Sequence, residues 1–273
     1  MDELNWEGEN IVKKEKYKFY DLVEIMKILR SEGGCPWDRE QTHESLKRYL
    51  IEETYEVLEA IDKGDKSLLC EELGDLLLQI VFHARIAEEN KDFNIDDVNT
   101  GIYKKMYSRH THVFGEEKAE TSDDVLQNWD KIKRNEKQIS TYTGEMKSIA
   151  KNLPALMRSY KVQHKAAKVG FDWDNVDDAM AKVYEEIEEL KNARQNGNKE
   201  EMHEEMGDLL FAVVNVSRFL EIHPELALSD SVEKFIRRFD YIEKNAINNG
   251  KNLEEMTLKE MDDLWNQSKS QKN

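Results

Sequence analysis

Residues 52–56 read Glu-Glu-Thr-Tyr-Glu and residues 71–77 read Glu-Glu-Leu-Gly-Asp-Leu-Leu, and this acidic pattern occurs a second time 133 positions later. In the second occurrence, residues 185–189 read Glu-Glu-Ile-Glu-Glu and residues 204–210 read Glu-Glu-Met-Gly-Asp-Leu-Leu. A match that keeps its register over two separate segments indicates an internal repeat. The chain therefore contains the same acidic unit twice.

The repeat extends on both sides of these acids. Upstream, the Gly-Cys-Pro-Trp-Asp of residues 34–38 corresponds to the Gly-Phe-Asp-Trp-Asp of residues 170–174. Downstream, the basic and aromatic residues that correspond are Lys105 with Lys234, Arg109 with Arg238, Trp129 with Trp265, and Lys133 with Lys269. A period this long indicates a duplicated domain and not a solenoid. We predict two tandem homologous domains, 15–140 and 150–270, joined by a polar linker over 137–147.

Composition favours helices throughout. The chain of 273 residues has 39% apolar and 36% charged residues, with only three prolines and twelve glycines. That is too little turn chemistry for a sheet of many strands, and Glu, Lys, Leu and Ala are good helix formers. The predicted fold class is all-α, with each domain a helical bundle that contains a pair of acidic antiparallel helices.

Charge, hydropathy and cysteine content together argue against several classes of protein and partner. With 57 acidic and 40 basic residues the net charge is −17, and this repels nucleic acid. The uncharged runs are shorter than the roughly 20 residues of a membrane helix, and the N-terminus lacks the apolar core of a signal peptide. Two cysteines are too few for a disulfide framework. We expect a cytoplasmic protein that binds neither nucleic acid nor membranes.

Helical periodicity places the acids where they can act together. At about 100° per residue, Glu53 and Glu72 each lie at the edge of an apolar stripe, with Glu56 and Asp75 beside them. Packing the two stripes in one core brings four carboxylates together in each domain: Glu53, Glu56, Glu72 and Asp75 in the first, and Glu186, Glu189, Glu205 and Asp208 in the second.

Four such carboxylates require a cation or shared protons. Two like charges about 5 Å apart cost roughly 3 kcal/mol at an effective dielectric near 20, and oxygen ligands without Cys or paired His suit a hard cation such as Mg²⁺. The simpler alternative is a solvated Glu-rich face. A di-iron site is not favoured, because the Glu-x-x-His segments at 40–43 and 200–203 occupy non-equivalent places in the two copies.

These motifs resemble those of the MazG-type, all-α nucleoside triphosphate pyrophosphohydrolases, and the similarity covers nearly the whole chain. The resemblance implies Mg²⁺-dependent hydrolysis of a nucleoside triphosphate to the monophosphate and pyrophosphate, removal of unwanted nucleotides, and a homodimer. It implies that the eight acids named above are metal ligands. It also implies that the second copy's acids act in catalysis together with Lys234, Arg238 and Lys269, which contact phosphates, while Trp265 lies near the base. Lys105, Arg109, Trp129 and Lys133 would bind substrate in the first copy.

Several alternatives stay open. The enzyme could be restricted to dUTP or dCTP, or act on a phosphoribosyl-nucleotide. One domain could be a non-catalytic helical module for nucleotide sensing or dimerisation. The general base is not assigned, although Glu52 and Glu185 adjoin the predicted ligands. We expect the second copy to be the more active, because Arg237 adds a further cation there.

Overall fold

A computed structural model describes residues 15–136 and 141–270 of the chain. All regular elements in these ranges are helices, and the chain divides into two compact units between Ile132 and Lys133. The prediction of an all-α fold with two tandem acidic units is confirmed. Part of the predicted linker, 137–140, lies outside the described residues, and Tyr142–Lys147 forms helix α8.

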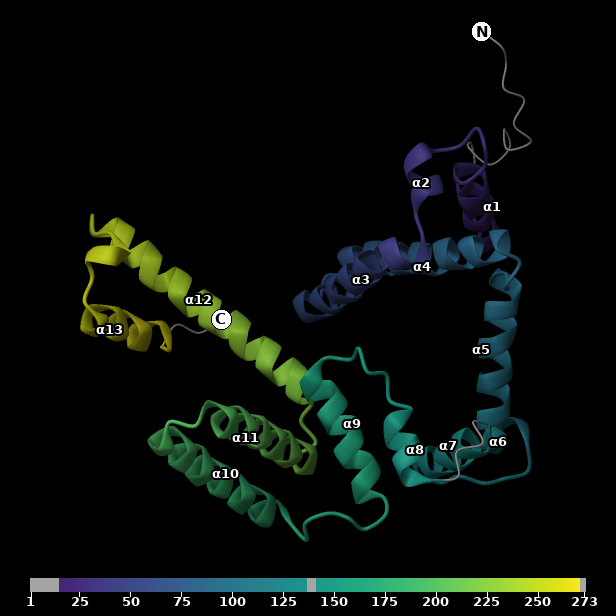
Figure 1. Cartoon of the computed structure of the whole chain (residues 1–273). Helices are drawn as coiled ribbons and strands as arrows, with labels where there is room; N and C mark the ends of the chain where they lie inside the picture. The colour runs from purple at the N-terminus through teal and green to yellow at the C-terminus, as the bar shows by residue number, and fades with distance from the viewer. Residues whose placement is uncertain (1–14, 137–140, 271–273) are drawn as a thin grey trace. The chain divides into compact units, whose positions relative to one another are not determined.

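Figure 1 shows the helices of the two units in chain order. The first unit begins with α1 (Phe19–Leu29), α2 (Pro36–Glu40), α3 (His43–Lys63), α4 (Lys66–Glu89), α5 (Ile95–Arg109) and α6 (Thr111–Phe114), and α7 (Ser122–Glu136) extends across the division between the units. The second unit continues with α8, α9 (Ala155–Ala167), α10 (Val176–Asn196), α11 (Lys199–Phe219), α12 (Pro224–Asn248), a 3₁₀ turn (Leu253–Glu255) and α13 (Leu258–Ser268).

Tight turns set the acidic helices antiparallel. Helix α3 ends at Gly64, whose φ of +64° is left-handed, and α10 ends in the same way at Gly197 with φ +68°. The next residue caps the following helix: the Asp65 carboxylate accepts hydrogen bonds from two backbone N–H groups of α4, and Asn198 does the same for α11. Each turn thus ends one helix and starts the next within two residues, and α3 packs along α4 as α10 packs along α11.

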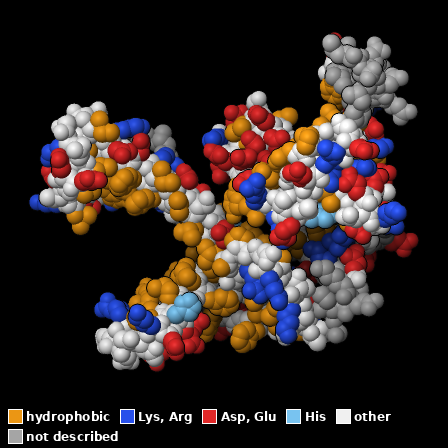
Figure 2. Space-filling view, turned by 45° about the horizontal axis from the view of Figure 1, so that its top comes forward, with side chains coloured by type: hydrophobic (Ala, Val, Ile, Leu, Met, Phe, Trp, Pro, Cys, Tyr) orange, Lys and Arg blue, Asp and Glu red, His pale blue; other side chains and the backbone are white. Residues whose placement is uncertain are grey.

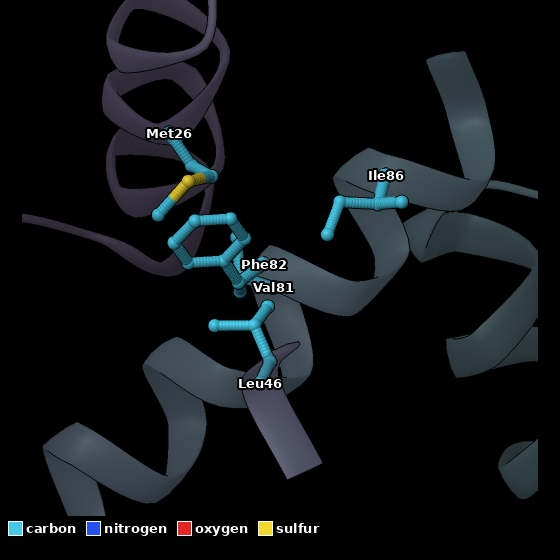
Figure 3. Packing of buried hydrophobic residues seen from close by; sticks show 5 residues of the cluster. All are labelled: Met26, Leu46, Val81, Phe82 and Ile86. Carbon is cyan, nitrogen blue, oxygen red and sulfur yellow. The ribbon is translucent and has the colours of Figure 1, made fainter. Parts of the chain in front are cut away.

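The first unit has a close-packed apolar centre. Met26 of α1 and Leu46 of α3 meet Val81, Phe82 and Ile86 of α4 there, each at most 5% exposed (Figure 3). In the second unit, α9 packs on α11 and α12, and α12 packs on α13. No helix within the described residues is long and apolar enough to cross a membrane.

Candidate active site

The second unit brings three of its four predicted acids together. One carboxylate oxygen each from Glu186 on α10 and from Glu205 and Asp208 on α11 lie within 4.8 Å of one another. Glu186 is only 4% exposed, whereas Asp208 is exposed. The antiparallel turn at Gly197 therefore produces the juxtaposition that the helical periodicity predicted.

A lysine compensates part of this negative charge. The Nζ of Lys182, one helical turn before Glu186, lies 2.7 Å from Oε1 of Glu186 and 2.7 Å from Oε1 of Glu185. The two carboxylates raise the pKa of Lys182, which keeps the ammonium charged. The other oxygen of Glu186, Oε2, is buried and has no hydrogen-bond partner among the described residues. One acceptor of the cluster is thus left for a ligand.

The first unit also gathers three acids between its matching helices, although not the same three positions of the repeat. Oxygens of Glu53, Glu56 and Glu72 lie within 4.8 Å of one another between α3 and α4. Partial burial, and then the charges of Asp75 and Glu56, raise the pKa of Glu53. Desolvation and the neighbouring Glu56 likewise raise the pKa of Glu72. Asp75 therefore acts electrostatically on the cluster, although it is not one of the three converging acids.

Glu189 of the second unit is the counterpart of Glu56, which does belong to the converging acids of the first unit. Glu189 lies outside the group of three converging acids in its own unit, yet its charge contributes to the raised pKa of Glu205, after desolvation. Desolvation and then the neighbouring carboxylate of Glu186 raise the pKa of Glu189 itself. Desolvation is the first cause of these raised carboxyl pKa values and the neighbouring carboxylates add to it, so a bound cation would favour the charged forms.

A cavity of about 730 Å³ opens beside the acids of the second unit. Lys182, Glu186 and Asp208 line one part of it. Apolar and aromatic side chains line another part, including Phe171 and Trp173 from the loop that joins α9 to α10. This loop is the Gly-Phe-Asp-Trp-Asp segment found by the repeat, and it begins at Gly170 with φ +80°. The cavity thus joins a charged wall to an apolar one.

The matching positions of the first unit are filled by core residues. Phe82, the counterpart of the cavity residue Asn215, is 3% exposed, and Met26, the counterpart of Val162, is 1% exposed. Both belong to the apolar cluster of Figure 3. The two units therefore share their acids but differ in the space beside them.

Of the residues predicted to bind the nucleotide in the second unit, Arg238 of α12 and Trp265 of α13 lie close to each other. The guanidinium carbon of Arg238 lies 5.3 Å from the centre of the Trp265 ring, and the Phe235 ring lies 5.2 Å from it. Lys269 Nζ donates to Asn266 at 2.8 Å. The described residues that line the cavity include none from α12 or α13, so the structure does not bring Lys234, Arg238, Trp265 or Lys269 to the cavity wall.

Their counterparts in the first copy of the repeat lie near the end of the first unit, except Lys133, which begins the second unit. Lys105 and Arg109 lie in the last turns of α5, and Trp129 and Lys133 lie on α7. The Trp129 ring packs edge-on against His110, with ring centres 4.9 Å apart.

Lys182 was missed by the sequence analysis. Its counterpart in the first unit is Tyr49, so a search for residues shared by the two copies passes over it. The signal that was present is its spacing, because Lys and Glu four residues apart on a helix face one another.

Comparison with known proteins agrees with this arrangement. The family model described as the MazG nucleotide pyrophosphohydrolase domain matches twice, over residues 41–114 and 175–242, which include all eight predicted acids. The chain is 44% identical over 253 residues to the nucleoside triphosphate pyrophosphohydrolase/pyrophosphatase MazG of Thermotoga maritima, covering 92% of this chain and 95% of that protein. It is also 44% identical to the nucleoside triphosphate pyrophosphohydrolase of Escherichia coli, covering 92% and 96% of the two chains. This chain therefore belongs to the MazG nucleotide pyrophosphohydrolase family, because it carries the acid clusters on two pairs of antiparallel helices and is similar to these relatives along nearly its whole length.

Proposed function

We propose that this protein hydrolyses nucleoside triphosphates to the monophosphate and pyrophosphate with Mg²⁺, and that the second unit carries the turnover. The single observation that carries this proposal is the cavity of the second unit, which joins Glu186 and Asp208 to an apolar wall. A nucleotide has the same two parts, a polyanion and an aromatic base. Relatives named for this activity, which match 92% of this chain, support the reaction class.

The residues present fit Mg²⁺. All donors of the cluster are carboxylate oxygens, which hard cations prefer, and the buried Glu186 Oε2 has no partner among the described residues. We infer that Glu186, Glu189, Glu205 and Asp208 hold the ion, and that Glu53, Glu56, Glu72 and Asp75 form the matching site. Bound Mg²⁺ would polarise phosphoryl oxygens and lower the pKa of water.

The chain's own side chains contribute in different ways. Lys182 keeps Glu186 oriented through a 2.7 Å ion pair. Glu185, which shares this lysine, is exposed and adjoins the ligands, so it is a candidate to accept the proton of the attacking water. Lys234, Arg238 and Lys269 do not line the cavity, so their predicted role in stabilising the charge on the departing pyrophosphate requires the triphosphate to extend beyond the cavity wall. The aromatic cavity wall would shield the base from water.

A homodimer is part of this proposal. Helix α12 exposes a series of apolar side chains at helical spacing: Val232, Phe235, Ile236 and Phe239, each more than 40% exposed. Hydrophobic side chains are visible on the surface in Figure 2. Burying such a stripe against a second copy would be favourable by the hydrophobic effect, and light scattering would measure the mass directly. A cytoplasmic location agrees with a nucleotide substrate.

One observation favours a second role for the first unit. Phe82 and Met26 fill the positions that correspond to the cavity wall, which supports a non-catalytic function in dimerisation or nucleotide sensing there. Restriction to dUTP or dCTP, or action on a phosphoribosyl-nucleotide, remains the enzymatic alternative for the second unit.

Matched variants of the full chain test the proposal. Glu205→Gln with Asp208→Asn alters the second unit, and Glu72→Gln with Asp75→Asn makes the same change in the first. Pyrophosphate release from a panel of nucleoside triphosphates should be lost in the former and kept in the latter, with helical circular dichroism unchanged. Undiminished release after the second-unit change, or orthophosphate as the first product, would contradict the proposal.

A further inference from the structure

Gln163 presents a buried acceptor in the cavity wall of the second unit. This residue of α9 is 8% exposed and lines the cavity. Its Nε2 donates to the backbone carbonyl oxygen of Phe211 at 2.8 Å, while its Oε1 is buried and has no hydrogen-bond partner among the described residues. Because a carbonyl oxygen only accepts, the amide nitrogen must face Phe211. The orientation of Oε1 is therefore fixed by the backbone.

Asn215 offers the opposite group in the same cavity. Its Oδ1 accepts from Nε of Arg218 at 3.1 Å and from a terminal nitrogen of Arg218 at 3.0 Å. Arg218 is itself held by an ion pair with Asp172 of the cavity loop, and its side chain is only 10% exposed. Since a guanidinium only donates, the Asn215 oxygen must face Arg218. This leaves Nδ2 as a donor, with no partner among the residues that the structure describes.

Unlike the metal-site acids, which occur in both copies of the repeat, the two amides occur only in the second copy. The first unit has Lys27 where the second has Gln163, and Phe82 where it has Asn215. The Phe211 carbonyl, which only accepts, fixes the orientation of the Gln163 amide, and the Arg218 guanidinium, which only donates, fixes that of Asn215. Neither amide can therefore rotate by 180° to exchange its donor and acceptor for a different ligand. A buried acceptor left unpaired is unfavourable, and a ligand N–H in the cavity would remove this cost.

We propose that Gln163 and Asn215 read the edge of the nucleobase. Gln163 Oε1 accepts from an exocyclic amino N–H of the base, and Asn215 Nδ2 donates to the neighbouring ring nitrogen. The aromatic side chains Phe171 and Trp173, from the cavity loop, offer contact to the faces of the ring. The ligand class is a base with an adjacent donor and acceptor. This inference rests on the proposed function, which supplies a nucleotide as the substrate.

Nucleotide pairs that differ only in the exocyclic amino group test the role of Gln163. We would titrate the full-length protein with Mg²⁺ and the α,β-methylene triphosphates of adenosine and purine riboside, and of cytidine and pyrimidin-2-one riboside, by calorimetry. These analogues lack the anhydride bond that the proposed reaction breaks. In at least one pair, the wild type should bind the amino-bearing member about 30-fold more tightly, because the other leaves Gln163 Oε1 unpaired.

The variants give distinct signatures. Gln163→Leu should bind both members of the pair alike, whereas Asn215→Leu should weaken both members by a similar factor and keep the ratio, since both retain the acceptor. The control Gln195→Leu makes the same chemical change at an exposed position of α10 and should behave as the wild type. A merely structural role of Gln163 would weaken both members and preserve the ratio.

Two results would overturn the inference: no difference within either pair for the wild type, or a difference that persists in Gln163→Leu while its circular dichroism is native. If Gln163→Leu does not fold, Asn215→Leu decides, and unchanged affinity there also overturns the inference. Pyrophosphate release from unmodified triphosphates is measured in parallel. Release without a difference within the pairs refutes base reading alone, whereas a difference without release refutes the proposed catalysis alone.

Discussion

Replacing Lys182 by Met removes one charge next to a buried carboxylate and keeps most of the side-chain stem. Two unit charges 2.7 Å apart interact by about 1.5 kcal/mol in a water-like dielectric and about 6 kcal/mol at an effective dielectric of 20. Glu186's side chain is 5% exposed but that of Lys182 is 34% exposed, so the lower end applies. We expect a loss of about 2 kcal/mol in the free energy of unfolding of the metal-free protein.

Mg²⁺ should reduce this loss, because the ion is a second counter-charge for Glu186. Urea denaturation followed by circular dichroism, in EDTA and in saturating MgCl₂, measures both values. By linkage, the variant should bind Mg²⁺ more tightly by the same factor, about tenfold if the loss shrinks by about 1.4 kcal/mol. Lys191→Met is the matched control, since Lys191 pairs with Glu188 on the same helix and both side chains are more than half exposed.

The control should change the unfolding free energy by less than about 0.5 kcal/mol under either condition. An equal loss for Lys182→Met with and without Mg²⁺, or a Mg²⁺ affinity that is unchanged or weaker, would refute the reasoning. Either result would mean that the lysine and the metal ion do not share Glu186.

Three further perturbations test the acids, the core and the turn. The pKa of the Glu205 carboxyl is raised in the native state, so the stability of the metal-free wild type falls as the pH rises from about 4.3 through the native pKa. Glu205→Gln removes this titrating group. The variant should therefore melt at a higher temperature than the wild type at pH 8 in EDTA, and Mg²⁺ should stabilise it less. Leu46→Ala, at a position 1% exposed in the first unit, should cost about 3 kcal/mol, seen by calorimetry as an earlier transition, while pyrophosphate release below that transition persists. Gly197→Ala places a Cβ in open space at φ +68°, so only backbone strain of about 1 kcal/mol should appear as a lower urea midpoint; a loss above about 3 kcal/mol would mean that the turn is packed more tightly than the structure shows.

Much of the fold followed from periodicity and repetition. The acids at 52–56 and 71–77 border apolar stripes of period 3.6, and their return at 185–189 and 204–210 predicted two equivalent helix pairs. The turn glycines occupy left-handed conformations in both units, which is the property that distinguishes glycine from other residues. The helix pairs and the convergence of the acids are therefore local consequences of the sequence.

The cavity depended on neighbours that are distant in the sequence. Asn215 lines a cavity because of how α9 packs against α11 in the second unit. Phe82 lies in a core because of how α1 packs against α4 in the first unit. The shared pattern of the two copies even concealed the difference, because a search for matching residues discards those that differ. Gln163 likewise looks like an ordinary polar helix residue until its burial is known.

The sequence by itself determined the helices, the duplication and the grouping of carboxylates, because these depend on residues within one or two helical turns of each other and on a short turn. Only the tertiary structure decided that the second unit leaves a cavity beside its acids, that Lys182 compensates Glu186 there, and that the cations of α12 and α13 do not line that cavity. These features depend on how the side chains of separate helices pack and pair with one another, and a local sequence pattern does not specify such contacts.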